Sequence, residues 1–250
     1  MSTYVLVPGF FFGPWVWEEV GRLLRDAGHE VRAVYLTGHG ERAAEATPEA
    51  TPDVGVSTHV ADITDAIGDA DDVVLVLHSG ATIAGTAAAD RPPERLRRIV
   101  YVDTAPFPDG MAQIEFLPPD AQAEQRRRIE TDEKGWLLPA RPFDEDDQRR
   151  DPVSLAGLSA DDLARMRRRA TAQPAALVLD PARRPAEIPD TPRTLIASTF
   201  TVDQVRAMVA AGLPAFTMLA GPGWTMTELP TGHWPMLSRP KELAELLLAM

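Results

Sequence analysis

The chain has 250 residues, of which 44% are hydrophobic and 25% charged, and its formal net charge at pH 7 is −12. This composition excludes disordered, collagen-like and coiled-coil chains, and the acid excess argues against nucleic acid and anionic membranes as partners. No cysteine is present, which excludes disulfides and a cysteine nucleophile. The first nine residues look like a strand rather than a signal peptide, and no apolar run reaches about 18 residues, so we predict a cytoplasmic protein.

In the first hundred residues, short runs rich in β-branched side chains alternate with amphipathic segments. The expected strands are Tyr4–Val7, Val31–Leu36, Val73–Leu77 and Ile99–Val102. Between them, the segments Trp15–Ala27 and His59–Ile67 have helical spacing, and each is followed by a glycine. Strands that alternate with helices predict an α/β fold, in which helices cover both faces of a parallel sheet.

The pattern changes between Pro106 and Arg184, where prolines, acidic pairs and arginine runs interrupt any strand. Helices are expected at Asp120–Ile129 and at Ser159–Ala170, the second with Ser159 as its N-cap. We interpret the arginine runs as solvated helix faces rather than anion sites. This region is therefore predicted to be a helical insertion.

Strand character returns at Thr194–Ser198 and Trp224–Leu229. The last segment, Ser238–Met250, is expected to be a helix capped by Ser238. No internal repeat and no long linker divide the chain, so we predict one domain over residues 1–250, with the insertion at about 106–184.

A serine lies where a predicted buried strand runs directly into a helix. The segment Val73–Ala84 reads V-V-L-V-L-H-S-G-A-T-I-A, with Ser79 at the junction. Such a turn exposes the hydroxyl above the sheet and directs helix N–H groups toward a developing anion. The same pattern also fits a serine that caps a helix. The junction makes Ser79 a candidate nucleophile.

A histidine, His233, lies between the last predicted strand and the last helix, in the sequence T-G-H-W-P. Ligands of open α/β sheets bind at this carboxyl edge. No two of the five histidines have metal-ligand spacing, so no metal site is predicted. Neither type of glycine-rich phosphate loop is present, so no nucleotide cofactor is predicted.

The loop after the first strand reads P-G-F-F-F-G-P-W, from Pro8 to Trp15. It begins at the carboxyl edge of the sheet, near the expected position of Ser79. The backbone N–H groups of Phe10 and Gly80 are candidates for binding an oxyanion. Nearby aromatic rings suit either an apolar pocket or core packing. The residues that we assign to substrate binding are Phe11, Phe12, His78 and Trp234.

Together these segments resemble the α/β-hydrolase superfamily, in its compact esterase and hydroxynitrile-lyase branch. The resemblance covers nearly the whole chain, through V-L-V-P-G-F-F-F-G-P-W-V-W, A-G-H-E-V, T-G-H-G-E-R, V-L-V-L-H-S-G-A, I-V-Y-V-D-T and T-G-H-W-P-M-L-S-R-P-K-E-L. It implies a mostly parallel eight-stranded sheet and a small helical cap at about 106–184. It also implies Ser79 as nucleophile and His233 as general base, with the acid between them in chain order.

Two departures from the family pattern affect the turn and the oxyanion loop. Leu77 and Ala81 occupy the glycine positions of the family's G-x-S-x-G turn. We expect the alanine to fit and the leucine to crowd the turn or reshape the site. Pro8 and Gly9 replace the usual His-Gly, which changes the support of the loop but keeps its N–H donors.

A third departure concerns the acid, because Thr201 occupies the position where the family usually carries an aspartate. Two carboxylates are alternatives. Asp103 follows the strand that ends at Val102, whereas Asp203 also fits a helix-capping role beside Thr201. We favour Asp103 over Asp203.

Three functions fit this sequence. The first is hydrolysis of a carboxylic ester or lactone of an apolar small molecule through an acyl-enzyme on Ser79, with His233 as base. Phe10 and Gly80 would then bind the oxyanion, and Asp103 would orient the imidazole. The second is lyase, cyclase or epimerase chemistry on a natural-product intermediate, without an acyl-enzyme. The third is a non-catalytic binding module. We favour the first function, because a binding scaffold needs neither the serine nor the histidine.

Overall fold

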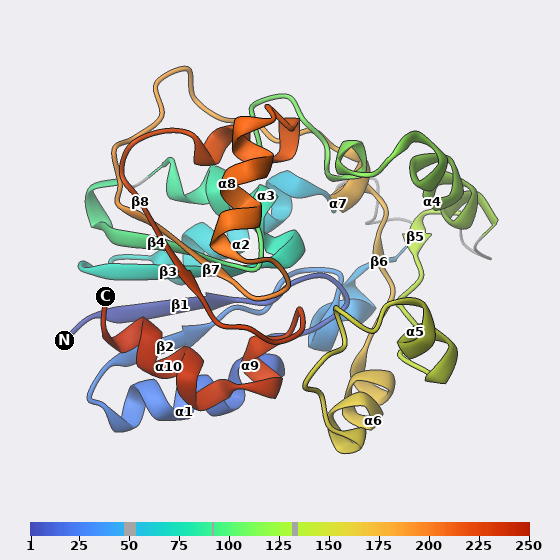
Figure 1. Ribbon diagram of the computed structural model, residues 1–250, viewed down its shortest axis with the longest axis horizontal. Coiled ribbons are helices and arrows are strands. Elements are labelled where there is room, and N and C mark those ends of the chain that lie inside the picture. The colour runs from blue at the N-terminus through green and yellow to red at the C-terminus, as the bar shows by residue number, and fades with distance from the viewer. Residues whose placement is uncertain (48–53, 92, 132–134) are drawn as a thin grey trace.

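The computed structural model describes residues 1–47, 54–91, 93–131 and 135–250 (Figure 1). Six strands form a fully parallel sheet in the order β2-β1-β3-β4-β7-β8. Their bounds are Thr3–Val7 for β1, Glu30–Ala33 for β2, Val73–His78 for β3, Leu96–Val102 for β4, Arg193–Ala197 for β7 and Trp224–Glu228 for β8. The α/β class that the alternation of strands and helices predicts is confirmed.

The sheet contains fewer strands than the eight that the family resemblance implies. Within the described ranges six strands belong to it, and two short strands form a separate antiparallel pair, β5 (Leu137–Leu138) and β6 (Gln173–Pro174). The number eight came from the resemblance, whereas the residue pattern itself marks six runs with strand character. The residue pattern was therefore the better guide to the strand count.

Helices cover both faces of the sheet (Figure 1). On one face lie α1 (Glu18–Asp26), α9 (Pro235–Ser238) and α10 (Pro240–Leu248), and on the other lie α2 (Val56–Ile67), α3 (Thr82–Ala89) and α8 (Val202–Ala210). Successive side chains of a strand point to opposite faces, so β3 contributes Leu75 and Leu77 to one core and Val74 and Val76 to the other. None of the helices in the described parts of the chain is long and apolar enough to cross a membrane.

The expected C-terminal helix is present as α10, but it begins later than predicted. Ser238 is the last residue of α9, and Arg239 is the N-cap of α10, so the prediction that Ser238 caps the last helix is wrong. Proline lacks an N–H and disfavours helical backbone in the residue before it, and Arg239 has φ −141°. The cap predicted at Ser159 is confirmed, because its hydroxyl accepts the Asp162 N–H at 3.1 Å.

The segment between β4 and β7, called the insertion below, is mostly helical and lies beyond the carboxyl ends of the strands (Figure 1). Besides β5 and β6 it contains η6 (Gln113–Phe116), α4 (Pro119–Thr131), α5 (Glu145–Arg150), α6 (Ala160–Arg169) and α7 (Ala176–Leu179). Other 3₁₀ helices are η1 (Pro14–Trp17), η2 (Gly40–Glu45), η4 (Ser79–Ala81), η5 (Pro93–Arg95) and η7 (Pro214–Leu219). The predicted helix Trp15–Ala27 is thus η1 followed by α1.

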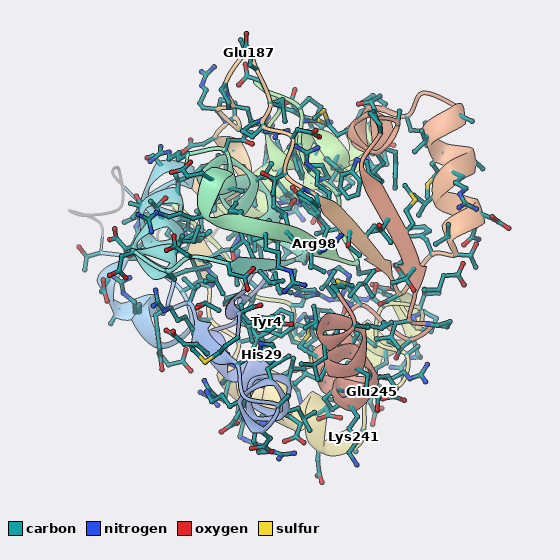
Figure 2. All side chains as sticks on the ribbon, turned by 90° about the vertical axis from the view of Figure 1, so that its left-hand side faces the viewer. Tyr4, His29, Arg98, Glu187, Lys241 and Glu245 are labelled. Carbon is teal, nitrogen blue, oxygen red and sulfur yellow. The ribbon has the colours of Figure 1, made fainter. Side chains whose placement is uncertain are left out.

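The opposite end of the sheet, where the strands begin, faces the viewer in Figure 2. There the hydroxyl of Tyr4 donates to the carbonyl of Leu247 at 3.0 Å, and the Tyr4 ring meets the His29 ring edge-on. Arg98 donates to the Thr194 hydroxyl at 2.9 Å. These contacts hold α10 and the neighbouring strands together at this end of the sheet. The candidate site lies at the opposite end, where the strands finish.

Candidate active site

Ser79 lies on a sharp turn between strand β3 and helix α3. Its φ of +51° is in the left-handed region, which few residues other than glycine adopt. Strain of this kind persists where surrounding packing enforces it, and it often marks functional turns. The Thr104 hydroxyl donates to the Ser79 carbonyl at 3.1 Å and so fixes the turn from the end of β4.

Leu77, which departs from the family's glycine, is accommodated by a glycine in the following helix. A Cβ added at Gly85 would lie 2.2 Å from Cδ2 of Leu77, so the leucine side chain occupies the space above this glycine. Leu77 is completely buried in the core between β3 and α3. The leucine therefore fits beneath the turn because α3 is built from small residues.

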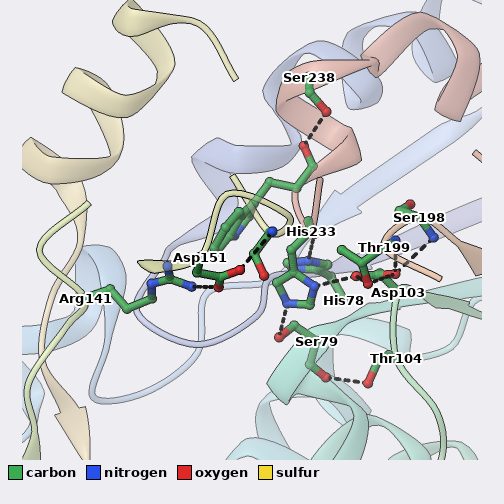
Figure 3. A network of polar contacts seen from close by, with 12 residues as sticks. His78, Ser79, Asp103, Thr104, Arg141, Asp151, Ser198, Thr199, His233 and Ser238 are labelled. Carbon is green, nitrogen blue, oxygen red and sulfur yellow. Dashed lines mark hydrogen bonds and ion pairs between the residues drawn. The ribbon is translucent and has the colours of Figure 1, made fainter. Parts of the chain in front are cut away.

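His233 connects Ser79 to Asp103 (Figure 3). The distance from Ser79 Oγ to His233 Nε2 is 2.8 Å, and that from His233 Nδ1 to Asp103 Oδ2 is 2.6 Å. A carboxylate only accepts, so Nδ1 carries the proton of that hydrogen bond, and Nε2 lies where it can accept the Ser79 hydroxyl. Ser79 directly follows β3, Asp103 directly follows β4, and His233 lies in the loop before α9.

Asp103 follows β4 with φ +49°, and its side chain is 4% exposed. Its Oδ1 accepts the backbone N–H groups of Ser198 and Thr199, both at 2.9 Å, and the Thr199 hydroxyl donates to both carboxylate oxygens. Burial raises the pKa of this carboxyl, but the hydrogen bond and charge of His233, together with the two N–H donors, lower it to about 2. Asp103 is therefore ionised at neutral pH.

Asp203, the alternative acid, does not reach His233. Its side chain is 91% exposed and pairs with Arg206 at 3.2 Å in the first turn of α8. Thr201 caps that helix, since its hydroxyl accepts the Gln204 N–H and its own N–H donates to the Gln204 side chain. The structure thus brings Asp103, and not Asp203, to the histidine.

The main chain of His233 is held from two directions. Its N–H donates to the Ser154 carbonyl of the insertion at 2.7 Å, and its carbonyl accepts from His78 Nε2 at 2.6 Å. A carbonyl only accepts, so His78 carries its proton on Nε2. Burial, followed by the charge of His233, lowers the pKa of His78 to about 3. His78 is buried, and its hydrogen bond to the His233 carbonyl holds the loop that carries His233.

The two predicted oxyanion donors lie beside the serine. Gly80 is the second residue of η4. The hydrogen bond of η4 runs from the Thr82 N–H to the Ser79 carbonyl, so the Gly80 N–H, which comes earlier in the chain, is not used within this helix. A Cβ added at Gly80 would lie 2.5 Å from the Phe10 ring. A Cβ added at Gly9 would lie 2.9 Å from Ser79 Cβ. The loop that carries Phe10 therefore packs directly on the Ser79 turn.

A cavity of about 490 Å³ opens beside Ser79 and His233. Its apolar lining comes from the chain after β4, from β7 with the loop and helix α8 that follow it, and from the segment around η7. These side chains are Ala105, Phe107, Met111, Phe116, Leu195, Ala197, Phe200, Val205, Leu213, Pro214, Phe216 and Leu219. Polar side chains on the wall are Thr82, Asp103, Thr104, Gln113 and Glu115.

The four residues predicted to bind substrate are not among those that line this cavity. Phe12 is 1% exposed and packs with Phe143 and Trp234 in the core beneath the insertion. Phe11 packs against the insertion, and His78 lies behind His233. The sequence reasoning missed Phe107 and Phe200, although each follows a strand at the carboxyl edge, where side chains of a ligand site are expected.

The comparison with protein families agrees with this arrangement. The model of the alpha/beta hydrolase family matches residues 4–246. The chain belongs to this family. The parallel sheet, the turn at Ser79 and the chain order of Ser79, Asp103 and His233 are features of such a hydrolase.

Curated relatives of this alpha/beta hydrolase are named as esterases. The Carbendazim hydrolyzing esterase of Nocardioides sp. (strain SG-4G) is 29% identical over 100% of both chains. Methylesterase 9 of Arabidopsis thaliana is 34% identical over 44% of this chain and 42% of its own. The protein is thus an α/β-hydrolase enzyme of the carboxylesterase type.

Solved structures share the fold at lower identity. A pyrethroid hydrolase from Sphingobium faniae JZ-2 aligns with a TM-score of 0.74 at 19% identity, over 99% of this chain and 96% of that chain. An extracellular alpha/beta-hydrolase from a Paenibacillus species aligns with a TM-score of 0.74 at 20% identity, over 100% and 98%. These likenesses establish the α/β-hydrolase fold. In the described ranges, no three His, Asp or Glu side chains come together as a possible metal site.

Proposed function

We propose that the enzyme hydrolyses a carboxylic ester or lactone of an apolar small molecule through an acyl-enzyme on Ser79. The observation that carries the proposal is the pair of hydrogen bonds that links Ser79 through His233 to Asp103, at 2.8 and 2.6 Å. His233 takes the hydroxyl proton as Ser79 Oγ attacks the carbonyl carbon, and it returns that proton to the departing alkoxide. Asp103 keeps Nδ1 protonated and stabilises the imidazolium.

The acyl-enzyme is released by the reverse sequence of proton transfers. His233 removes a proton from water, the hydroxide attacks the acyl carbon, and the proton passes to Ser79 Oγ as the carboxylic acid leaves. In both steps the negative charge on the carbonyl oxygen is stabilised by the N–H groups of Phe10 and Gly80. The position of Gly80 at the start of a helix and the contact of Phe10 with it support this assignment.

The cavity supports an apolar substrate. Its wall consists mostly of aliphatic and aromatic side chains, and a pocket of this kind gains affinity by removing apolar surface from water. The wall begins directly at Ser79 and Gly80, where the reacting carbonyl would lie. The relatives named methylesterases add methyl esters to the esters that we would test first.

We further propose that the chain is one domain in which residues 106–184 act as a helical cap. Phe107, Met111 and Phe116 of this segment form part of the cavity wall, which supports a role of the cap in substrate choice. No observation favours lyase, cyclase or epimerase chemistry, or a binding module, over hydrolysis. The relatives named as esterases support a small molecule as the partner, whereas the cytoplasmic location remains a prediction from the sequence.

Reaction with a fluorophosphonate probe, followed by intact-mass analysis, tests the proposal. The probe forms a stable adduct with a serine that a neighbouring base activates. We expect one adduct per wild-type chain and none on the folded Ser79→Ala or His233→Ala variants. Ser57→Ala removes an exposed serine of α2 and serves as the matched control, which should label like the wild type.

Two results would count against an acyl-enzyme. The first is folded wild-type protein that stays unlabelled, and the second is labelling that persists in Ser79→Ala. If the wild type is labelled as expected, a series of p-nitrophenyl esters, methyl esters and lactones with increasing acyl length defines the substrate range. A preference for the shortest acetyl substrates over longer apolar acyl groups would contradict the assignment of the cavity.

A further inference from the structure

The loop that carries Phe10 is hydrogen bonded to the far end of the insertion. The Phe11 N–H donates to the side-chain Oε1 of Gln173 at 3.0 Å, and the Phe11 carbonyl accepts the Thr171 N–H at 2.9 Å. The Thr171 hydroxyl in turn accepts the Gly40 N–H at 2.8 Å. Both backbone polar groups of Phe11 are therefore held by residues about 160 positions away in the sequence.

Phe11 needs such support, because its backbone adopts a conformation that side chains disfavour. Its φ is +71°, in the left-handed region. Phenylalanine has none of the local hydrogen-bonding capacity that lets asparagine or aspartate adopt this region. A backbone of this kind persists when surrounding contacts enforce it. The two hydrogen bonds from the insertion supply those contacts.

The position of Phe11 controls its neighbour Phe10, the proposed oxyanion donor. Gly9 packs against His78 and Ser79 on one side of Phe10, and Phe11 is hydrogen bonded on the other. The Phe10 N–H lies between these two fixed points, so its direction depends on both. A donor must point at the site of developing charge before the reaction starts, because misplacement by about 1 Å can reduce the rate about 100-fold.

Gln173 is well placed to act as the fixed point on the insertion. It is 0% exposed, and it belongs to β6, which pairs with β5 through Leu138. Its Oε1 accepts the Phe11 N–H, whereas its Nε2 has no hydrogen-bond partner in the described parts of the chain. In the described parts of the chain, the hydrogen bond from the Phe11 N–H is therefore the one that the buried side-chain amide of Gln173 makes.

We propose that Gln173 is a positioning residue, whose side-chain oxygen holds Phe11 and thereby directs the Phe10 N–H toward the oxyanion. This inference rests on the proposed function, because it needs a reaction in which charge develops on a carbonyl oxygen. In this account, a residue of the insertion helps to hold the Phe10 N–H in the direction that the reaction needs. The insertion thus acts on the rate of the chemical step as well as on the cavity wall.

Two isosteric substitutions separate the acceptor from the shape of the side chain. Gln173→Met removes the acceptor, and we expect kcat to fall about 10- to 100-fold with KM nearly unchanged. The affinity for a boronic acid, which mimics the tetrahedral intermediate, should fall by the same factor. Gln173→Glu keeps an acceptor oxygen whether ionised or protonated, so it should retain kcat within a few-fold.

Controls separate positioning from loss of stability. Ile63→Ala opens a cavity beside α2, in a core cluster that does not include Phe10 or Phe11, and should lower the melting temperature while kcat stays unchanged. If Gln173→Met does not fold, Gln173→Asn replaces it, because its shorter amide does not reach the Phe11 N–H and should lower kcat similarly. A purely structural role would lower the melting temperature without the selective loss of boronic acid affinity.

The outcomes distinguish this inference from the proposed function. A wild-type enzyme whose Ser79 is not labelled by the fluorophosphonate would overturn both. A labelled wild type, together with a Gln173→Met or Gln173→Asn variant that keeps the wild-type kcat and boronic acid affinity, would overturn the inference alone. A fall in kcat that Gln173→Glu shares fully would also overturn it, because the acceptor would then not be the cause.

Discussion

On one side of Ser79 lies a chain of hydrogen-bonded polar groups, and on the other lies an apolar cavity. The polar side consists of His233 and Asp103, with distances of 2.8 and 2.6 Å and further donors on Asp103. The cavity side consists of apolar side chains, among them the buried Phe107 and the half-exposed Phe200.

The hydrogen-bonded side and the cavity side should differ in how well they tolerate substitutions. A hydrogen bond is lost with a small displacement, whereas apolar contacts adjust at a lower cost. Changes on the polar side should therefore affect the rate of chemistry, and changes in the cavity wall should affect which substrate is accepted. The predictions below test this division, beginning with the largest expected effect.

Asp103→Asn should cause the largest loss of activity. The amide would no longer keep the Nδ1 proton of His233 in place or stabilise the imidazolium, and kcat should fall about 10⁴-fold. The matched control is Asp203→Asn, because this exposed carboxylate does not reach the histidine. Steady-state kinetics on one p-nitrophenyl ester measures both. Comparable losses in the two variants would contradict the assignment of Asp103.

Phe12→Ala and Phe200→Ala should separate core packing from the cavity wall. Phe12 is completely buried in the aromatic cluster, so its truncation should lower the free energy of unfolding by about 3–5 kcal/mol. Phe200 lines the cavity and is 46% exposed, so its truncation should leave stability nearly unchanged.

The two phenylalanines should also differ in their effect on specificity. Phe200→Ala should lower kcat/KM for esters of long acyl groups about 5-fold, which corresponds to about 1 kcal/mol of lost apolar contact. Folded Phe12→Ala should keep the wild-type preference among acyl lengths. Urea unfolding and an acyl-length series measure the two effects, and a specificity change confined to Phe12→Ala would reverse the assignment.

Gly85→Ala should destabilise the turn that carries Ser79. The added methyl would meet Leu77 at 2.2 Å, and such overpacking costs about 1–3 kcal/mol. Leu77→Ala alone should destabilise by leaving a void. The double variant Leu77→Ala/Gly85→Ala should be more stable than the sum of the single effects predicts, as measured by urea unfolding. Additive effects would show that the two residues do not share this space.

The pH dependence of unfolding should distinguish two polar groups at the site. The folded-state pKa of His78 is lowered to about 3. Its contribution to the free energy of unfolding is therefore fully present above pH 6.5 and falls as the pH drops toward 3. Asp103 has a lowered pKa of about 2, so its contribution is complete above 3.8 and is lost below that pH. Of these two groups, only His78 therefore changes the free energy of unfolding between pH 6.5 and 4.

A substitution at His78 tests this assignment. His78→Gln keeps a side-chain donor and removes the titration, so the slope of unfolding free energy against pH should decrease by about 1.4 kcal/mol per pH unit between pH 6 and 4. Urea unfolding across this range measures the slope. An unchanged slope would contradict the buried, neutral state of His78.

The polar side was easier to predict from the sequence than the cavity. Ser79 is marked by a buried strand that runs into a helix, and His233 by a loop between the last strand and helix, because both signals are local. Asp103 was one of two alternatives. The choice depended on β7, whose following residues Ser198 and Thr199 hold the carboxylate, and no local pattern reveals such a contact.

The cavity and the support of the loop that carries Phe10 depend on distant parts of the chain. Phe11 and Phe12 follow Phe10 in the same loop, but they pack against the insertion, so their position in the sequence did not place them in the cavity. Gln173 reaches Phe11 from a two-residue strand that no periodicity marks. The fit of Leu77 over Gly85 also needs the angle between β3 and α3, which the sequence does not specify.

The central claim is that Ser79 becomes acylated during turnover. The direct test is rapid-quench mass spectrometry of the enzyme with a p-nitrophenyl ester, combined with peptide mapping of the adduct. We predict a burst of about one equivalent of p-nitrophenol and an acyl group on the peptide that contains Ser79. Steady turnover of the ester by folded enzyme, with no burst and no acyl group on Ser79 at any quench time, would contradict the account.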